Sequence, residues 1–217
     1  MYRSDIICVT NRIICESSGE PFLDRIKKVA EAHPHAIILR EKDLNLSEYR
    51  VLAEKVSEIS SIILHNFYEL VLEDTNCSDS SAEKNDTYTR LHMPLWKLAK
   101  LRDENPDIYA KLCSRLKELG SSCHSVEDAV LAESLGCTYI IAGHIYNTDC
   151  KKGLEGRGLD FLKEVASSVK IPVYAIGGIT PDNIREVRNA GAAGACIMSS
   201  AMLCDNPAKL IKSLCPN

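Results

Sequence analysis

The sequence has no apolar run long enough to cross a bilayer, for which about eighteen residues are needed. Its amino-terminal segment carries charges at Arg3, Asp5 and Arg12, so the unbroken apolar core of a secretory signal is also missing. There is no excess of positive charge either, because 26 Lys and Arg residues stand against 30 Asp and Glu residues, for a net charge of −4. We therefore expect neither a membrane nor a nucleic acid as a partner.

Paired cysteines are missing too, although the chain contains ten cysteine residues. None of them forms a C-x-x-C pair, and their spacing matches neither a zinc site nor a disulfide framework. This distribution is typical of reduced, buried thiols. We therefore expect a cytoplasmic protein without a cysteine-bound metal.

Short apolar runs alternate with segments of helical periodicity along the chain. With 217 residues, 45% of them apolar, the chain is long enough for one substantial core, so we expect a single domain over residues 1–217. The alternation predicts βα units with a parallel sheet. Eight such units of about 27 residues favour a compact (β/α)8 TIM barrel over an open, doubly wound sheet. The predicted strands are 6–9, 36–39, 62–64, 88–92, 115–119, 139–142, 173–176 and 195–198.

Two of the expected helices have clear start and stop signals. One starts after Ser125 as its N-cap and ends at Gly136. The other has Thr180 as its cap, Pro181 in its first turn and Gly191 at its end. One segment breaks the regular pattern, because residues 73–87 are polar and without periodicity. They predict an irregular or flexible insertion.

Small residues follow the last two predicted strands. Gly177 and Gly178 come directly after the seventh strand, and Ser199 and Ser200 follow the eighth. In TIM barrels the loops after these two strands commonly bind phosphate through backbone N–H groups at a helix N-terminus. The glycines could instead form only a tight turn, and the serines only a helix cap. Because both features occur at consecutive strand ends, we favour a phosphate site.

The ends of the other strands carry cations, an amide and histidines. Arg40 and Lys42 follow the second strand, where they could bind an anion or form a solvated pair balanced by Glu41 and Asp43. A histidine has an ordinary pKa near 6.5, so it can take and return a proton near neutral pH. Any single histidine is more often structural, but three at one mouth favour a proton shuttle. The further candidates at these ends are Asn66, His92, Ser122, His124 and His144.

A basic, glycine-rich segment, GHIYNTDCKKGLEGRG, follows the sixth predicted strand at residues 143–158. Its glycines let the chain fold over the mouth of the barrel, which is typical of a lid. Lys151 is its candidate anion contact. His144, one residue past the strand end, could assist another histidine or simply pack.

These residues together resemble the thiamine-phosphate synthase/TenI superfamily of small (β/α)8 barrels. The matching segments are LREK at 39–42, Asn66, SSCHS at 121–125, Lys151, AIGGI at 175–179 and MSSA at 198–201. Residues 143–158 are similar to the TenI branch, whose members are thiazole tautomerases. These enzymes aromatise a carboxythiazole phosphate by moving a proton from the ring to the exocyclic carbon.

The resemblance implies roles for the candidate residues. His124 would be the catalytic base, and the phosphate would lie on the backbone around Gly178 and Ser199, with Lys151 closing over it. Arg40 and Lys42 are the candidates for the substrate carboxylate. The partner would be a small phosphorylated heterocycle, with no cofactor and no metal, and the assembly could be a homodimer.

The chain departs from the synthase pattern at acidic positions. Synthases join hydroxymethylpyrimidine pyrophosphate to a thiazole phosphate, and Mg²⁺ neutralises the departing pyrophosphate. Their motif has a Gln before LREK, an Asp after the strand-three Asn and another Asp beyond strand four. This chain has Ile38, Phe67 and the acid-free segment HMPLWKL at 92–98. We therefore expect a tautomerase; the alternatives are an Mg²⁺-dependent synthase and a non-catalytic protein that senses thiazole or thiamin phosphate.

Overall fold

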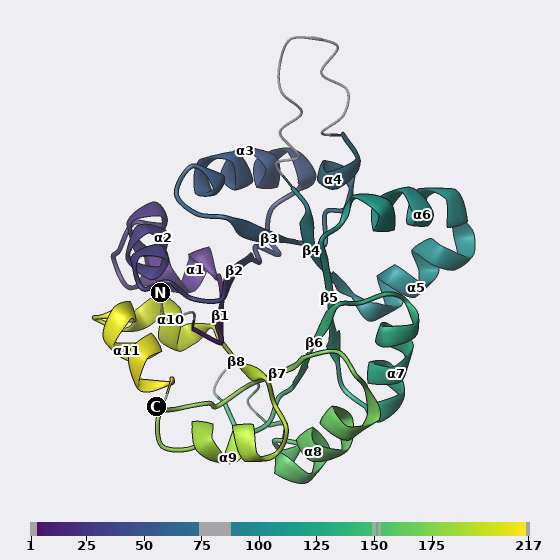
Figure 1. Cartoon of the computed structure of the whole chain (residues 1–217). Coiled ribbons are helices and arrows are strands. Elements are labelled where there is room, and N and C mark those ends of the chain that lie inside the picture. Colours follow the sequence, from purple (N-terminus) through teal and green to yellow (C-terminus); the bar gives the residue numbers. More distant parts are fainter. Residues whose placement is uncertain (1–3, 74–87, 149–150, 152, 216–217) are drawn as a thin grey trace.

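Eight parallel strands form a closed barrel in a computed structural model that describes residues 4–73, 88–148, 151 and 153–215. Each strand pairs with the next along the chain, and β8 pairs with β1 (Figure 1). This closed sheet confirms the predicted (β/α)8 TIM barrel. The strands are β1 (Ile6–Val9), β2 (Ala36–Leu39), β3 (Ile62–His65), β4 (Arg90–Pro94), β5 (Glu118–Cys123), β6 (Tyr139–Gly143), β7 (Val173–Ile176) and β8 (Gly194–Ile197).

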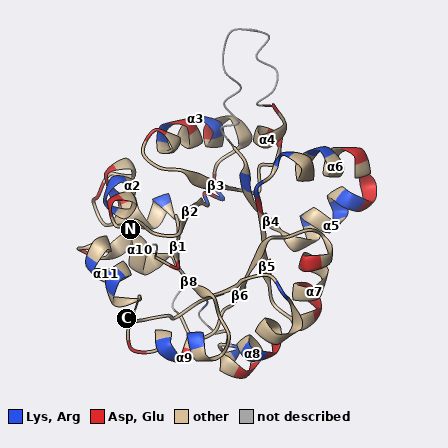
Figure 2. Ribbon diagram, in the orientation of Figure 1, with Lys and Arg blue, Asp and Glu red and all other residues tan. Residues whose placement is uncertain are grey.

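A ring of helices covers the outside of the barrel (Figure 1). Figure 2 shows that Lys, Arg, Asp and Glu lie mainly on these helices, with both signs interspersed around the ring. None of the described helices is long and apolar enough to span a membrane. The helices are α1 (Arg12–Ser17), α2 (Phe22–Glu31), α3 (Leu46–Ser57), α4 (Glu69–Glu73), α5 (Leu95–Glu104), α6 (Pro106–Arg115), α7 (Val126–Ser134), α8 (Gly158–Ser168), α9 (Ile184–Asn189), α10 (Ser199–Leu203) and α11 (Pro207–Ser213).

The core has two parts because successive strand residues point to opposite faces of the sheet. Outward-facing residues such as Leu39 and Leu64 pack against the helices, while inward-facing residues such as Ile38 and Ile63 fill the barrel. The barrel interior is therefore a packed core rather than a channel, and chemistry is confined to its ends.

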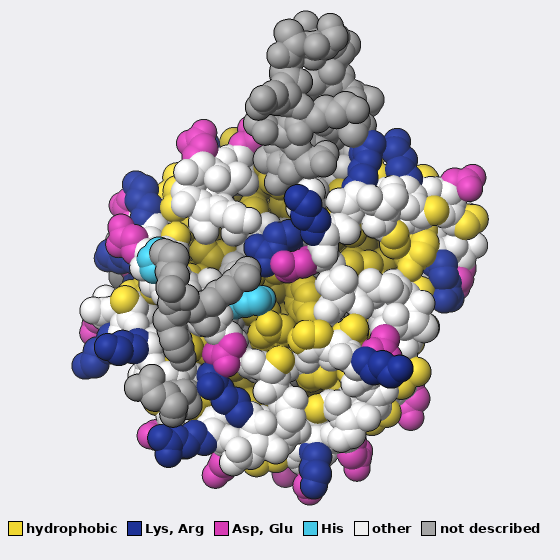
Figure 3. All heavy atoms as spheres, viewed as in Figure 1, with side chains coloured by type: hydrophobic (Ala, Val, Ile, Leu, Met, Phe, Trp, Pro, Cys, Tyr) yellow, Lys and Arg dark blue, Asp and Glu magenta, His cyan; other side chains and the backbone are white. Residues whose placement is uncertain are grey.

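The two ends of the barrel differ. In Figure 1 the strands follow one another clockwise. Because βα crossovers are right-handed, a barrel shows this order when it is viewed from the amino ends of its strands. Figure 3 shows this face, with basic, acidic and histidine side chains beside apolar ones at its centre. Arg90 and Glu118, the first residues of β4 and β5, form an ion pair of 2.9 Å. The candidate site residues at the carboxyl ends of the strands lie on the opposite face.

Two predicted strands have different bounds in the structure. The fourth is Arg90–Pro94 rather than 88–92, and the fifth is Glu118–Cys123 rather than 115–119. Arg115 is the last residue of α6, so the apolar pattern that we read as one strand spans a helix end and a strand start. As a result, His92 lies in the middle of β4 rather than at its end, and Ser122 lies within β5 rather than beyond it.

The start and stop signals of the first helix are confirmed, and for the second helix the stop at Gly191 is confirmed but the start at Thr180 is wrong. The Ser125 hydroxyl accepts a hydrogen bond of 3.0 Å from the Asp128 N–H and caps α7, as predicted. Thr180 does not cap a helix, because α9 starts only at Ile184. Thr180 instead donates its N–H to the Asn183 side chain at 2.9 Å and so belongs to a turn.

The predictions for the cysteines and for the insertion have different outcomes. Eight cysteines lie within the described residues, all as free thiols and six of them buried, as predicted.

For the insertion predicted over 73–87, Glu73 is the last residue of α4, and residues 74–87 lie outside the part of the chain that the structure describes.

Candidate active site

His124 lies at the junction of β5 and α7, one residue past the strand end. Its backbone N–H donates to Asp128 Oδ2 at 2.8 Å, and Asp128 is itself bound to the Ser125 cap. The His124 ring is exposed, and its Nδ1 lies 2.9 Å from the carbonyl oxygen of Gly143 at the end of β6. A carbonyl only accepts, so Nδ1 must carry the proton, which leaves Nε2 as the basic nitrogen in the neutral ring.

The rim of the barrel continues from His124 to the seventh strand. Gly143 pairs with Ile176 across β6 and β7, and the next residue, Gly177, packs against His144. A Cβ at Gly177 would lie 2.4 Å from the His144 Cβ, and the φ of Gly177 is +103°. His144 is buried, with its Nε2 3.3 Å from the Leu154 carbonyl oxygen. His144 therefore has a packing contact that explains its position, while the catalytic candidate is the exposed His124.

Gly178 and Ser199 start the loops that we predict to bind phosphate. Gly178 has a φ of +67°, and a Cβ there would lie 2.7 Å from the Tyr146 Cβ. Its carbonyl accepts a hydrogen bond of 2.9 Å from Asn183 Nδ2. Ser199 is the first residue of α10, and the adjacent Ser200 is exposed. This geometry is that of a tight turn beside a helix start, and phosphate binding by these loops stays a prediction.

Arg40 extends from the end of β2 towards the eighth strand. Its backbone N–H donates to the Thr10 hydroxyl at 2.9 Å, and its Nη1 lies 3.9 Å from the Met198 sulfur. Met198 immediately precedes Ser199. The guanidinium is therefore close to the end of β8, where the predicted phosphate loop starts.

Glu41 does not balance the rim cations, so the alternative of a solvated pair balanced by Glu41 and Asp43 is wrong. It is only 4% exposed, and it accepts hydrogen bonds from the Thr10 hydroxyl at 2.5 Å and from the Arg12 N–H at 2.8 Å. Its burial raises the pKa of the carboxyl above the usual range. Asp43 is also engaged, in a 2.5 Å ion pair with Arg12. Both acids are thus turned towards the β1–α1 junction.

Lys42 and Lys151 belong to different loops at the carboxyl end of the barrel, after β2 and after β6. The pKa of Lys42 is lowered by the charge of Arg40, by partial burial and by the charge of Lys151. Like charges lower the pKa of an ammonium because they disfavour its charged form. The mouth therefore concentrates positive charge contributed by the β2–α3 and β6–α8 loops.

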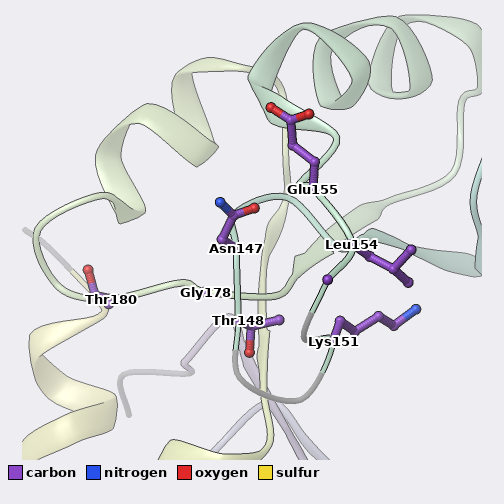
Figure 4. Close-up of a pocket in the computed structure, with 8 residues that line it drawn as sticks. Asn147, Thr148, Lys151, Leu154, Glu155, Gly178 and Thr180 are labelled. Atoms are coloured by element: carbon purple, nitrogen blue, oxygen red, sulfur yellow. The ribbon is translucent and has the colours of Figure 1, made fainter.

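A cavity of about 700 Å³ lies between the β6–α8 and β7–α9 loops. In Figure 4 the side chains of Lys151 and Leu154 lie on one side of it, and Thr180 lies across from them. The loop that carries Lys151 thus covers the same part of the mouth as the glycines after β7. The lining residues are Asn147, Thr148, Lys151, Gly153, Leu154, Glu155, Gly178 and Thr180.

Inside the barrel, below the mouth, lies a polar group that our reading of the sequence only partly found. His92 is 3% exposed, with Nδ1 3.1 Å from the Tyr139 hydroxyl and Nε2 2.9 Å from the Ser122 hydroxyl. Burial, with a smaller effect of Arg40, lowers the pKa of His92 to about 3. His92 is therefore neutral at physiological pH, and its contacts orient the Ser122 hydroxyl.

Lys97 is the functional candidate that our reading of the sequence missed. It lies in the first turn of α5, and its Nζ donates to the carbonyl oxygen of Asn66 at 2.9 Å. Asn66 directly follows β3, has a φ of +72°, and donates its own N–H to the His92 carbonyl at 2.9 Å. The one available signal was the lysine itself, because the first turn of a helix usually favours acidic residues.

The residues at the ends of β2, β3 and β4 do not fit a divalent cation. Mg²⁺ prefers several oxygen ligands, typically including carboxylates. Here Phe67 follows Asn66, Lys97 is the charged residue after β4, and Glu41 is turned towards Thr10. Within the described ranges, no group of three or more His, Cys, Asp or Glu side chains could hold a metal ion.

Comparison with known proteins gives a consistent family. A family model described as thiamine monophosphate synthase matches residues 6–201. A thiamine-phosphate synthase from Desulfitobacterium hafniense is 30% identical over 212 residues, which cover 95% of this chain and 93% of that protein. A putative thiamine-phosphate synthase 2 from Aquifex aeolicus is 31% identical over 176 residues, with coverages of 81% and 87%. Among solved structures, a thiamine phosphate pyrophosphorylase from Pyrococcus furiosus has the same fold, with a TM-score of 0.73, 23% identity and coverages of 97% and 93%.

Proposed function

The chain belongs to the thiamine monophosphate synthase family, and from that premise we propose that it is an enzyme of thiamin biosynthesis that acts on a phosphorylated thiazole. We further propose that its reaction is the tautomerisation that aromatises a carboxythiazole phosphate. The hydrogen bond between His124 Nδ1 and the Gly143 carbonyl is the observation that carries this proposal, because it leaves Nε2 available as a base.

His124 performs the proton transfer in this proposal. Its Nε2 removes a proton from the ring of the substrate and returns one to the exocyclic carbon, so no atom or electron is gained or lost overall. The Gly143 carbonyl stabilises the imidazolium that forms in between, since Nδ1–H donates to it in both protonation states. The backbone hydrogen bond to Asp128 holds the residue at the strand end throughout.

The two anionic groups of the substrate meet different parts of the mouth. The phosphate binds at the loops that start at Gly178 and Ser199, with Lys151 on the loop above them. The carboxylate binds to the cations that follow β2, Arg40 and Lys42. Support comes from the pKa of Lys42, which is lowered by the charges of Arg40 and Lys151 as well as by partial burial. The Arg40 side chain reaches Met198 beside Ser199, so the two anion sites are neighbours at the mouth. The ring is thereby oriented between the two ends.

A second candidate function is that of a thiamine-phosphate synthase, which is how the Desulfitobacterium relative is named. The residues after β3 and β4 support it less well, because Phe67 and Lys97 lie where oxygen ligands for a magnesium–pyrophosphate complex would be useful. A synthase would release thiamin phosphate from hydroxymethylpyrimidine pyrophosphate and thiazole phosphate. The tautomerase needs neither the pyrimidine nor Mg²⁺.

The test is the variant His124→Gln, assayed with enzymatically generated thiazole tautomer. A positioned acid–base group contributes about 10²–10⁴-fold to rate, so turnover should fall by about that factor while affinity for thiazole phosphate changes little. The exposed His33, changed to Asn because its φ is +50°, is the matched control and should keep full activity. Wild-type turnover in the His124 variant would reject the assigned role.

A further inference from the structure

We propose that Lys97 joins Arg40 and Lys42 in an oxyanion subsite on the β2–β4 side of the mouth, and that this subsite binds its anion without a divalent metal. The ligand class is a carboxylate or phosphate group. If the tautomerase function proposed above is correct, this group is the carboxylate of the thiazole. Lys97 is then a residue that determines specificity for a substrate with anionic groups at both ends.

The position of the Lys97 ammonium is fixed by two contacts. Its Nζ donates to the Asn66 carbonyl at 2.9 Å and lies 5.3 Å from the ring centroid of Tyr68. Both partners follow β3, so the charge is held at the carboxyl end of the barrel although Lys97 itself belongs to α5. An ammonium has three N–H donors, and one bond to Asn66 leaves two that can reach an anion.

Strand register brings Arg40 to the same side of the mouth. Leu39 pairs with Leu64, so Arg40 and His65 are adjacent at the ends of β2 and β3. The electrostatic environment of His65 agrees with this arrangement. Its pKa is lowered to about 3, mainly by burial and then by His92 and by the charges of Arg40, Lys42 and Lys97. Three cations, two from the β2–α3 loop and one from α5, therefore act on one histidine at the rim.

Lys97 lies at a helix position that usually does not favour a cation. The first turn of α5 contains no acidic residue, and its N-cap, Pro94, makes no side-chain capping bond. A cation in the first turn is disfavoured by the helix dipole. Lys100, one turn further along, has the ordinary surface arrangement, with Glu104 at 3.8 Å. The contacts of the Lys97 ammonium with the Asn66 carbonyl and the Tyr68 ring offset this unfavourable helix position and hold the charge at the mouth.

The same ammonium conflicts with a metal at this place. A divalent cation beside Asn66 would face the positive charge of Lys97, and the acids nearest in sequence to Arg40 are occupied by Thr10 and Arg12. An oxyanion would instead meet an ammonium, a second ammonium and a guanidinium. The subsite therefore supplies with side chains the positive charge that a bound metal would otherwise provide.

The test is calorimetric titration with inorganic pyrophosphate in the presence of EDTA. We expect binding without Mg²⁺, and we expect Lys97→Met to weaken it by about 10- to 150-fold, since a hydrogen bond to a charged group contributes about 1.5–3 kcal/mol. Lys97→Arg keeps the charge and should retain most of the affinity. Lys100→Met, on the same helix, is the matched control and should bind like the wild type. Circular dichroism confirms that each variant is folded.

Two results would overturn the proposal. One is binding that appears only when Mg²⁺ replaces EDTA, because the subsite would then need a metal. The other is metal-free binding that Lys97→Met leaves unchanged, because the anion would then lie elsewhere. The titration requires no turnover, so an enzyme that binds pyrophosphate through Lys97 yet does not convert the thiazole would contradict the tautomerase assignment alone.

Discussion

The buried histidine inside the barrel makes the stability of the protein depend on pH. His92 is held between Ser122 and Tyr139 and has a pKa of about 3 in the folded protein. In the unfolded chain a histidine has a pKa near 6.5. At a pH between these two pKa values, His92 is therefore protonated in the unfolded state and neutral in the folded state. The stabilising effect of a neutral His92 is fully present above pH 6.5 and is lost as the pH falls towards 3.

The size of the effect follows from these two pKa values. Between pH 7 and pH 5 the contribution of His92 to the free energy of unfolding should fall by about 2 kcal/mol. Domains of this kind are typically stable by only about 5–15 kcal/mol, so the loss is measurable. His65, with its lowered pKa, acts in the same direction. Glu41 acts in the opposite direction, because a raised pKa gives stability that is lost as the pH rises.

The contribution of His92 can be measured by urea unfolding of the wild type and of His92→Gln at pH 7, 6 and 5. The glutamine keeps a donor and an acceptor but does not titrate, so the variant should lose about 2 kcal/mol less than the wild type between pH 7 and pH 5. Glu41 is present in both proteins, so its effect cancels in the difference, and burial, the main cause of the lowered pKa of His65, also stays the same. The exposed His33→Asn serves as the control and should follow the wild type. Equal losses in His92→Gln and the wild type would refute the reasoning.

Two further predictions concern packing and reactivity. Gly177→Ala should lower the free energy of unfolding by about 1–3 kcal/mol beyond the cost of its left-handed backbone, because the new Cβ would lie 2.4 Å from that of His144. Gly136→Ala is the control for the backbone cost alone, because φ there is +69° and an added Cβ would meet no described atom within 4 Å. An equal loss in the free energy of unfolding for both variants would contradict the packing argument. Burial raises the pKa of the Cys8 thiol far above its usual range, so N-ethylmaleimide at pH 8 should leave Cys8 unmodified in the native protein and label it in urea, as mass spectrometry would show. Labelling of native Cys8 at the rate seen in urea would contradict its burial.

The fold could be predicted because its signals are local and repeated. Eight apolar runs separated by helical periods define the barrel, and the Ser125 cap is visible in the sequence as a serine before a helical segment. The bounds of β4 and β5 could not be read as well, because the barrel interior there contains His92 and Ser122 rather than apolar side chains. Polar residues that form hydrogen bonds with one another inside a barrel look like loop residues in the sequence.

Residues of the candidate site could be predicted only where they follow a strand in the sequence. Arg40 and the glycines after β7 could be found in this way, since each is one or two residues past an apolar run, and His124 follows the predicted fifth strand by five residues. Lys97 could not, because its partner Asn66 is 31 residues away and a lysine at a helix start normally faces solvent. The orientation of Glu41 was also hidden, because its partners Thr10 and Arg12 come from the preceding βα unit.

The most direct test of the proposed reaction is to follow the wild-type protein with the thiazole tautomer in EDTA, without any pyrimidine, by proton NMR. Transfer by His124 predicts steady formation of the aromatic carboxythiazole phosphate, and a loss of rate of about 10²–10⁴-fold in His124→Gln. The contradicting result would be an unchanged tautomer under these conditions together with steady formation of thiamin phosphate once hydroxymethylpyrimidine pyrophosphate, thiazole phosphate and Mg²⁺ are supplied.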